Sequence, residues 1–275
     1  MQNQFQRTES ILGPESTARL KECHVIVFGC GGVGGYVIES LTRSGVGKID
    51  IVDSDEVDIT NLNRQIIATH DTVGRNKVDV FEERIKSINP NVVLRTFNGT
   101  YLSMESYEKR LFTTHGASNA QQAHKSPCVA DSPNGISDSN LLTYKVFDFA
   151  GYDYIIDAID TVSSKIDLVL QAEKSGTPII SAMGCGNRID PSKLTYTDIY
   201  KTHTDPLAKV MRKELKSREI KKLDVVYSTE EPIKPNFEGL SGELPARKNA
   251  PGSSPFVPAS AGLLIGSVVV KNLLK

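Results

Sequence analysis

The sequence predicts an α/β fold with a doubly wound, mostly parallel sheet of the Rossmann-like type. The first observation is the stretch VIVFGCGGVGGYVIESL, in which an apolar run at 25–28 enters a glycine-rich turn and then a helix. The second is the alternation of further apolar strand runs with helical segments, which is typical of βαβ units. With 275 residues, the chain is long enough for one large α/β domain or two modest ones.

The predicted elements follow one another in a regular order. Val78, Phe81 and Ile85 recur at helical spacing, and Asn89-Pro90 ends that helix. The expected elements are a helical arm at 4–20 with a turn at Gly13-Pro14, strands at 25–28 and 49–53, a helix at 77–88, and strands within 91–98, 152–160 and 176–184.

Three segments depart from this alternation. Residues 112–140 are rich in Ser, Ala, Asn, Gln, Gly and His without periodicity, which predicts a flexible insertion loop. Residues 230–258 hold six prolines and predict an extended segment. Residues 209–222 carry seven basic and two acidic side chains, which is typical of a solvated helix face and also of a surface that binds nucleic-acid phosphates.

Composition excludes several classes of protein. The formal net charge is -1, so no field of the whole molecule points to nucleic acid or membrane. The four cysteines are scattered without a C-x-x-C pair, which gives no zinc-ribbon or disulfide pattern and suits a reducing cytoplasm. The first ten residues lack the pattern of a secretory signal. The apolar run at 261–270 is too short to span a bilayer, so we expect a core helix there.

The glycine turn predicts a phosphate-binding site. Gly29, Gly31 and Gly34 satisfy G-x-G-x-x-G, with Gly32 as an additional glycine. Such a turn lets the backbone approach a phosphate at the N-terminus of a helix. Asp53 ends the next strand, 53 − 34 = 19 residues beyond Gly34, where a ribose-binding carboxylate is expected. The motif alone fits NAD, FAD or ATP.

The connection after the second strand is unusually polar. Asp53, Asp55, Asn61, Asn63, Arg64, Gln65 and Lys77 fall within a short span. A site that moves charge at the α-phosphate of a triphosphate needs such cations, whereas a dinucleotide site does not. A solvated loop with a chance charge cluster is the alternative.

Several motifs in this order resemble the ThiF/MoeB/HesA superfamily, the adenylating enzymes related to ubiquitin activators. The resemblance rests on GCGGVGGYVIESLTRSGVGKIDIVDSDEVDITNLNRQ, VGRNKVD and DAIDTVSSK, which span roughly the first two thirds of the chain. Within the superfamily, AMGCGNRIDPSKLTYTDIYKTHTDPLAKVMRKELK and VVYSTEEP are most similar to the branch that dehydrates threonylcarbamoyladenosine in tRNA.

The resemblance implies roles for individual residues. Gly29, Gly31, Gly32 and Gly34 would form the nucleotide loop, together with Asp53 at the ribose and with Asp55 and Asn63 nearby. Asn61, Arg64 and Gln65 match a phosphate-contacting block, Lys77 matches a lysine on the triphosphate, and Asp160 matches a carboxylate that holds Mg²⁺. The catalytic residues would then be Arg64, Lys77 and Asp160. Arg7 corresponds to an arginine that some members insert into the partner's site, although a plain surface arginine is an equal reading.

The implied activity is ATP-dependent cyclisation of threonylcarbamoyladenosine in the tRNA anticodon loop, through an acyl-adenylate of the threonyl carboxylate. It implies a single adenylation domain over 1–275, with the insertion at 112–140 and a region at 205–275 that packs and binds tRNA. It also implies a cytoplasmic homodimer, with a sulfur-transfer or desulfurase protein as a further candidate partner. The expected tRNA contacts are Lys209, Arg212, Lys213, Lys216, Arg218, Lys221 and Lys222.

Two departures from the superfamily narrow the chemistry. The zinc-binding C-x-x-C pairs of the thiamine and molybdopterin relatives are missing, so we expect no zinc. Cys30, Cys128 and Cys185 occupy no obvious position for a thioester, which disfavours a relay to a ubiquitin-like protein. Three alternatives remain open at this stage: adenylation of the C-terminal glycine of a small sulfur carrier, a nicotinamide dehydrogenase, and a scaffold that binds nucleotide without chemistry.

Overall fold

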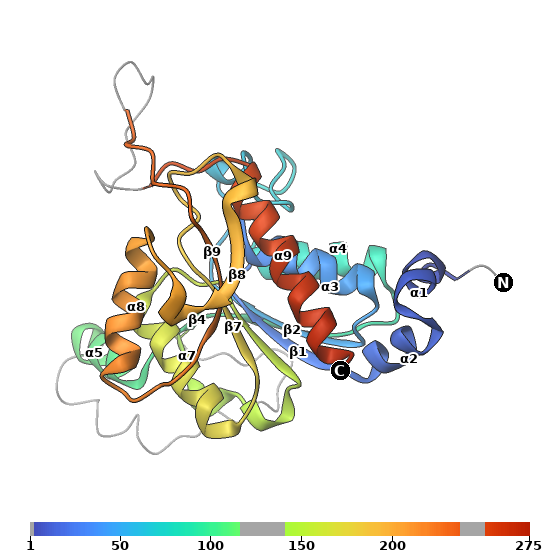
Figure 1. Ribbon diagram of the computed structural model, residues 1–275, viewed down its shortest axis with the longest axis horizontal. Helices are drawn as coiled ribbons and strands as arrows, with labels where there is room; N and C mark the ends of the chain where they lie inside the picture. Colours follow the sequence, from blue (N-terminus) through green and yellow to red (C-terminus); the bar gives the residue numbers. More distant parts are fainter. Residues whose placement is uncertain (1–2, 116–140, 237–250) are drawn as a thin grey trace.

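A seven-stranded sheet with helices on both faces forms the centre of the molecule (Figure 1). The computed structural model describes residues 3–115, 141–236 and 251–275. The strand order is β3-β2-β1-β6-β7-β9-β8, and all neighbours are parallel except β8 and β9. The strands are β1 (His24–Phe28), β2 (Lys48–Asp53), β3 (Val93–Asn98), β6 (Tyr154–Asp157), β7 (Ile179–Ala182), β8 (Leu194–Asp198) and β9 (Asp224–Ser228), with β4 (Thr100–Tyr101) and β5 (Leu141–Leu142) as a separate pair. This confirms the predicted fold class.

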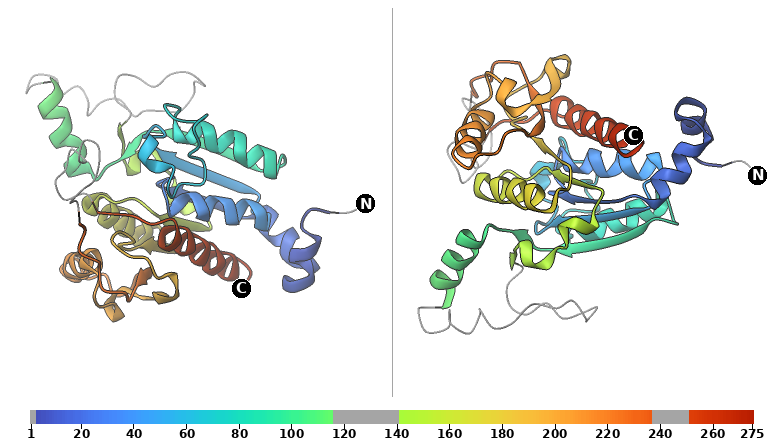
Figure 2. Two further views of the ribbon diagram at one scale, coloured as in Figure 1. Left: turned by 90° about the horizontal axis from the view of Figure 1, so that it is seen from above. Right: turned by 60° about the horizontal axis from the view of Figure 1, so that its bottom comes forward.

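Helices cover the two faces of the sheet in separate layers (Figure 2). Helices α3, α4 and α9 pack on one face, and α7 with α8 beside it packs on the other. Alternation within the strands supplies both cores, because Val25 and Val27 join one cluster while Ile26 and Phe28 join another. The helices are α1 (Gln6–Leu12), α2 (Pro14–Glu22), α3 (Gly34–Ser44), α4 (Lys77–Ile88), α5 (Met104–His115), α7 (Val162–Ser175), α8 (Pro206–Lys216) and α9 (Phe256–Leu273).

The register of the central strands brings their carboxyl ends to one edge. Phe28 of β1 pairs with Val52 of β2 on one side and with Asp157 of β6 on the other. The chain therefore leaves β1, β2 and β6 at the same level. The order also reverses between β1 and β6, and ligands of open α/β sheets bind at such a switch point.

The turn between β1 and α3 requires glycine at two positions. Gly29 has φ 91°, and a Cβ there would lie 2.7 Å from the Ala158 carbonyl oxygen. A Cβ on Gly34 would lie 1.8 Å from the carbonyl oxygen of Gly29. Strand, turn and helix thus pack too closely for a side chain, which is the physical reason for the glycine motif.

Helix α9 is the apolar element near the C-terminus. Among the described residues it is the one helix long and apolar enough to cross a membrane, yet 56% of it is buried in the protein. It packs on α3 with very close backbone approach, since a Cβ on Gly262 would lie 2.3 Å from the Val33 carbonyl oxygen. This agrees with the expected core helix.

The predicted strands and the helix at 77–88 are present, and so is the helical arm at 4–20, which consists of α1 and α2 with the expected turn at Gly13. Two other predictions need correction. The predicted insertion at 112–140 is wrong in its first four residues, because α5 continues to His115; residues 116–140 lie outside the described residues. The extended segment at 230–258 is wrong at its end, because α9 begins at Phe256; residues 237–250 lie outside the description.

Candidate functional site

A cavity of about 670 Å³ opens at the carboxyl edge of β1, β2 and β6. Its size suits a nucleotide-sized ligand. Ten of the predicted site residues line it: Gly29, Gly31, Gly32, Asp53, Asp55, Asn61, Arg64, Gln65, Lys77 and Asp160. The lining does not include Gly34, which begins α3, nor Asn63, which lies behind Arg64, nor Arg7, which is exposed on α1.

Asp53 ties the end of β2 to the glycine turn. One carboxylate oxygen accepts a hydrogen bond from the Cys30 backbone N–H at 2.6 Å, and the other accepts from the Asp55 N–H at 2.8 Å. Burial raises the pKa of the Asp53 carboxyl, and the nearby Lys77 ammonium opposes that rise. The carboxylate is therefore fixed in place with free lone pairs for a ligand hydroxyl.

Two cations, Lys77 and Arg64, line the cavity, and they differ in the charge of their hydrogen-bond partners. Lys77 begins α4 and is 4% exposed; its Nζ lies 2.7 Å from Asp55 Oδ2 and 3.9 Å from Asp53 Oδ1. Arg64 donates through Nη1 only to neutral oxygens, the Thr60 carbonyl at 2.9 Å and Asn63 Oδ1 at 2.8 Å. None of the ion pairs within the described residues involves Arg64. A half-buried guanidinium with neutral partners favours an anionic ligand.

Gln65 gives independent evidence of a ligand. Its side chain is buried and lines the cavity, and its Oε1 has no hydrogen-bond partner within the described residues. Buried polar atoms without partners are rare in native proteins and commonly mark a bound group. Asn61, four residues earlier, has a hydrogen-bond partner within the chain: with Asp58 it forms a capping box that shapes the short turn before Arg64.

Asp160 reaches the cavity from the loop after β6, and a buried ion pair fixes that loop. Lys165 and Asp157 are fully buried, with Nζ 2.9 Å from Asp157 Oδ2. Lys165 also donates to the carbonyls of Ile159 at 3.1 Å and Ala182 at 2.9 Å. Because all three Lys165 donors are used, the backbone that presents Asp160 has one well-defined position.

A single carboxylate at this edge could take part in a magnesium site. Within the described residues no group of three or more His, Cys, Asp or Glu side chains is arranged to hold a metal ion by itself. Magnesium is usually held by one or two carboxylates together with ligand phosphates and water. The exposed Asp160 carboxylate, facing a phosphate-sized cavity, fits that requirement.

Some cavity residues were not predicted. Thr100 and Tyr101 follow β3, and Thr161 follows Asp160. Thr100 and Tyr101 could have been predicted from the sequence. The carboxyl ends of neighbouring parallel strands meet at one edge, so residues just after the strand at 93–98 are expected at the site. Tyr101 is fixed by a 2.5 Å hydrogen bond that its hydroxyl donates to Asp167 Oδ2.

The described cysteines near the site are poor nucleophiles. Burial raises the pKa of the Cys185 thiol to about 12, and burial followed by the Asp53 charge raises the pKa of the Cys30 thiol. A nucleophilic cysteine needs a lowered pKa and access to substrate. Cys128 lies outside the described residues.

The basic residues at 209–222 divide into two groups. Arg212 bonds to Thr202, Arg218 pairs with Glu214, and Lys222 pairs with Asp224. The others are exposed and take part in no ion pair within the described residues. Three of them, Lys209, Lys213 and Lys216, recur along one face of α8, and Lys221 follows it.

Comparisons with known proteins agree with this geometry. The model of the ThiF family matches residues 2–273. The chain is similar to the tRNA threonylcarbamoyladenosine dehydratase of Bacillus subtilis, with 39% identity over 282 residues, covering 100% of this chain and 96% of that protein. It is also similar to crystal structures of the Escherichia coli tRNA N6-threonylcarbamoyladenosine dehydratase with AMP (TM-score 0.74, 28% identity) and with ATP (TM-score 0.72, 29% identity), each covering 98% of this chain and 93% of that one.

Proposed function

The chain belongs to the ThiF family, and from this premise we propose that it catalyses the ATP-dependent dehydration of threonylcarbamoyladenosine in tRNA. One observation carries the proposal: two cations line the same cavity as the glycine turn. Among the described residues Arg64 has only neutral partners, and Lys77 is buried at the cavity next to Asp53 and Asp55. The likeness to full-length dehydratases, with ATP or AMP in the related crystal structures, supports ATP as the ligand.

In this proposal each residue of the cavity has a defined task. The amides of the turn at Gly29, Gly31 and Gly32 approach the phosphates, and Asp53 accepts from a ribose hydroxyl. Gln65, together with Asn61, contributes to the same phosphate contacts. Arg64 and Lys77 neutralise charge on the α-phosphorus and on the departing pyrophosphate. Asp55 releases Lys77 for this role when phosphate arrives, because the Lys77 ammonium gains a more highly charged partner.

Asp160 would hold magnesium together with the phosphates of the nucleotide. When bound, the ion supplies Lewis-acid stabilisation of the leaving pyrophosphate. The task of this chain is to hold the Asp160 carboxylate at the cavity, which the buried Lys165–Asp157 pair supports.

The chemistry needs no enzymic nucleophile. A carboxylate oxygen of the threonyl group attacks the α-phosphorus, the bond from that phosphorus to the bridging oxygen breaks, and pyrophosphate leaves. The ureido group of the same nucleoside then attacks the acyl carbon and displaces AMP, which closes a ring with net loss of water. Both reacting groups belong to one molecule, so a high effective molarity drives the second step. The raised pKa of the Cys185 thiol is consistent with this route.

The tRNA would be held by the exposed lysines of 209–222, within a C-terminal region at 205–275 of one adenylation domain. Lys209, Lys213, Lys216 and Lys221 are the most available contacts, because Arg212, Arg218 and Lys222 already have partners in the chain. Lysine contacts to phosphates bind RNA without reading its sequence.

A homodimer belongs to the same proposal. Arg7 lies on α1, which precedes the amino edge of the sheet, whereas the cavity opens at the carboxyl edge, so Arg7 could act only on a partner's site (Figure 1). Phe256 and Leu263 lie two turns apart on α9 and are 53% and 49% exposed, which offers an apolar contact for a second copy. A cytoplasmic location and a sulfur-transfer or desulfurase partner stay predictions.

The test is incubation of the protein with ATP, Mg²⁺ and tRNA that carries threonylcarbamoyladenosine. We expect a nucleoside lighter by one water, detected by mass spectrometry after digestion, with one AMP formed per product. Parallel samples contain unmodified tRNA, a small sulfur carrier ending in Gly-Gly, or NADH. Pyrophosphate exchange stimulated by the carrier but not by tRNA, or hydride transfer from NADH, would overturn the proposal.

A further inference from the structure

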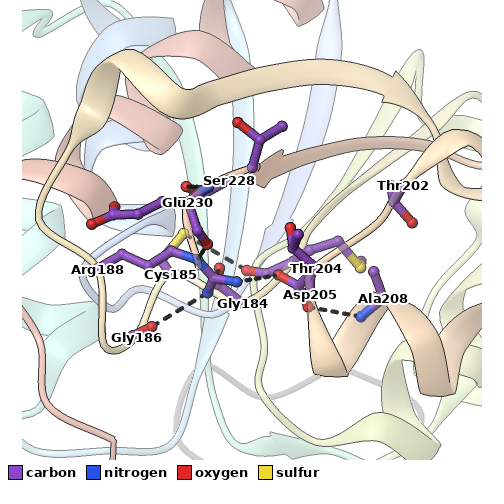
Figure 3. Close-up of polar contacts among 12 residues, drawn as sticks. Gly184, Cys185, Gly186, Arg188, Thr202, Thr204, Asp205, Ala208, Ser228 and Glu230 are labelled. Atoms are coloured by element: carbon purple, nitrogen blue, oxygen red, sulfur yellow. Dashed lines mark hydrogen bonds and ion pairs between the residues drawn. The ribbon is translucent and has the colours of Figure 1, made fainter. Parts of the chain in front are cut away.

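The loop at 183–190, which follows β7, has a buried arginine at its centre (Figure 3). The loop begins beside β9, where the Met183 N–H donates to the Val226 carbonyl at 2.9 Å. It leaves the sheet at the same edge as the cavity, since β7 is parallel to β6. One side of the loop contacts the start of α8, through Asp205.

Arg188 joins three segments of the chain through one guanidinium group. Within its own loop, Nη1 donates to the Gly184 carbonyl at 2.6 Å; toward the end of β9, Nε donates to the Glu230 carbonyl at 3.2 Å. Nη2 lies 3.4 Å from Asp205 Oδ2, and the two side chains are 2% and 0% exposed. Glu230 reciprocates, because its carboxylate accepts from the N–H groups of Ile189 and Asp190.

Asp205, the partner of Arg188, also binds the first turn of α8. Its other oxygen, Oδ1, accepts from the Ala208 N–H at 2.9 Å and so caps the helix. Thr204, with φ 58°, turns the chain just before the cap. A Cβ on Gly184 would lie 3.0 Å from Asp205 Oδ2, so the ion pair lies directly against the loop. The start of α8 is thereby fixed to 183–190.

The neighbouring residue, Asn187, fixes the segment at 251–254 to the same loop. Asn187 has φ 58° and exchanges two hydrogen bonds of 2.7 Å with the backbone of Gly252, one through its N–H and one through Oδ1. Ser254 adds a bond from its hydroxyl to the Arg188 carbonyl at 3.0 Å. The Asn187 carbonyl also accepts from the Ile233 N–H at 2.7 Å.

Segment 251–254 in turn contacts the nucleotide site. Asn63 Nδ2 donates to the Ser253 carbonyl at 2.9 Å, and Asn63 Oδ1 accepts from Arg64 Nη1 at 2.8 Å. Hydrogen bonds, one ion pair and short stretches of backbone therefore link α8 to Arg64: the Arg188 guanidinium holds the start of α8, whereas the Arg188 carbonyl and Asn187 hold segment 251–254, which contacts Asn63. A basic helix and a phosphate-binding arginine are held in one arrangement.

We propose that Arg188 is a positioning residue that fixes the RNA-binding helix α8 relative to the adenylation cavity. The inference rests on the proposed function, since it assumes that α8 holds tRNA. The lysines of α8 anchor the RNA, while Arg188 sets the distance at which the RNA presents its carboxylate to the α-phosphorus. Small displacements of a reacting group reduce rates strongly, so loss of Arg188 acts on turnover rather than on RNA affinity.

The central variant is Arg188→Lys, which keeps the charge but cannot contact Asp205, Glu230 and the loop together. At saturating ATP and tRNA we expect kcat to fall by about 10- to 100-fold, with KM for tRNA and Kd for ATP within about threefold of wild type. Asp205→Asn should reproduce the effect by removing the charge from the other partner. Arg43→Lys, the same substitution in the α3 pair with Glu39, is the matched control and should leave kcat unchanged.

Arg188 could instead contact tRNA directly or serve only the stability of the fold. Each of these two roles would change the kinetic constants in a different way. Replacing Lys209, Lys213 and Lys216 together by Ala should raise KM for tRNA and spare kcat. The proposal is overturned if Arg188→Lys behaves like this triple variant. It is equally overturned if Arg188→Lys lowers kcat only in proportion to the fraction of unfolded protein, measured by thermal melting.

A measurement without substrate separates this inference from the proposed function. In Arg188→Lys, hydrogen exchange should accelerate at the amides of both Ala208 and Gly252, while Val27 in β1 keeps its wild-type protection. Unchanged exchange at these two amides sinks the inference even if the enzyme cyclises tRNA. If the wild-type enzyme forms no cyclic product, the proposed function fails, and the exchange result alone decides whether Arg188 joins the two segments.

Discussion

Arg64 is the residue whose surroundings most directly indicate a ligand. In the part of the chain that the structure describes, its guanidinium hydrogen-bonds to the Thr60 carbonyl and Asn63 Oδ1 alone, and burial lowers its pKa from the very high value usual for arginine, so it stays charged. A charge held in place without a counter-charge is preorganised for an incoming phosphate. The function of this residue is therefore separable from its contribution to stability.

This separation gives the first prediction. Arg64→Ala should lower the rate of adenylation by about 10²- to 10³-fold, because one preorganised positive group is lost at the α-phosphate. The melting temperature should hardly change, since no ion pair is broken. Steady-state cyclisation with modified tRNA measures the rate, and Arg64→Lys should recover part of it. A rate within a few-fold of wild type for Arg64→Ala would remove this residue from the mechanism.

The Cys185 side chain, unlike that of Arg64, should not be needed for activity. Burial raises the pKa of its thiol to about 12, so almost no thiolate exists at neutral pH. Cys185→Ala should retain cyclisation within about threefold, because the substitution removes only a weak hydrogen bond of 3.7 Å from Sγ to the Met183 carbonyl. A thioester intermediate trapped on wild-type protein and missing from the variant would contradict this.

Glu39 on α3 yields a prediction about pH and stability. Burial alone would raise the pKa of its carboxyl, but hydrogen bonds from Arg84 and Arg43 outweigh burial and lower it. A lowered pKa in the folded state means that the stabilisation is present above the unfolded pKa and is lost as pH falls through the folded value. Glu39→Gln should therefore cost about 1–2 kcal/mol at pH 7.

The same difference should shrink as the pH falls below the ordinary glutamate pKa of about 4.3 and through the lower pKa of Glu39 in the folded state. Urea unfolding at several pH values measures it. Glu83→Gln is the control, because Glu83 pairs with Arg75 at the exposed surface, where such pairs contribute little. A pH-independent loss in Glu39→Gln would mean that packing, and not charge, sets its contribution.

At the scale of elements, the sequence predicted best where local pattern and tertiary packing agree. The helix at 77–88 has apolar residues at helical spacing and a clear stop at Asn89-Pro90, and α4 spans those residues. Likewise the placement of Asp53 at the glycine turn follows from its distance to Gly34 along the chain, because β1 and β2 pair directly. The helix at 77–88 and Asp53 are both positioned by contacts with segments that lie near them in the sequence.

Predictions failed where distant contacts decide the structure. Strand β8 carries polar residues such as Thr195 and Thr197, and it becomes a strand because it pairs with β9, which lies 26 or more residues later in the chain. Composition alone also gave no reason for α5 to extend to His115. The bonds from Asn187 to Gly252 and from Arg188 to Asp205 are likewise invisible in the sequence, because nothing local marks these side chains as partners.

The glycine turn gives an element-scale prediction with a natural control. Gly29→Ala adds a Cβ 2.7 Å from the Ala158 carbonyl oxygen and also strains a backbone at φ 91°. Gly74→Ala strains a similar backbone, φ 84°, with nothing within 4 Å of the new Cβ. We expect Gly74→Ala to cost about 1–2 kcal/mol of stability with normal ATP binding. Gly29→Ala should lose more stability and also ATP affinity, measured by calorimetry.

Equal ATP affinity in these two variants would mean that close approach of β1 to the loop after β6 does not shape the nucleotide site. The comparison is informative because both positions have a similar positive φ. A difference in ATP affinity then reports the effect of a side chain at the glycine turn, beyond the backbone strain that both variants share.

At the scale of the whole molecule, function depends on where charge lies rather than on its total. The net charge of -1 gives no overall attraction for RNA, yet Lys209, Lys213 and Lys216 form one row on α8. The cavity lies at the switch point between β1 and β6, and the loop after β7 is bonded to the start of α8. Under the proposed function, a near-neutral protein would bind RNA through this local cationic surface and would act only on RNA that also reaches the cavity.

The salt dependence of tRNA binding tests this arrangement. Each lysine that contacts a phosphate releases counterions, so the plot of log K against log salt should steepen by about 0.7 to 0.9 per contact. Replacing Lys209, Lys213 and Lys216 by Ala should weaken binding at low salt and flatten the slope by roughly two. Lys271→Ala, on the apolar helix α9, should leave the slope unchanged. If the triple variant keeps the wild-type slope, the RNA binds elsewhere. Helix α8 is then an ordinary solvated helix, and its fixed position does not serve RNA binding.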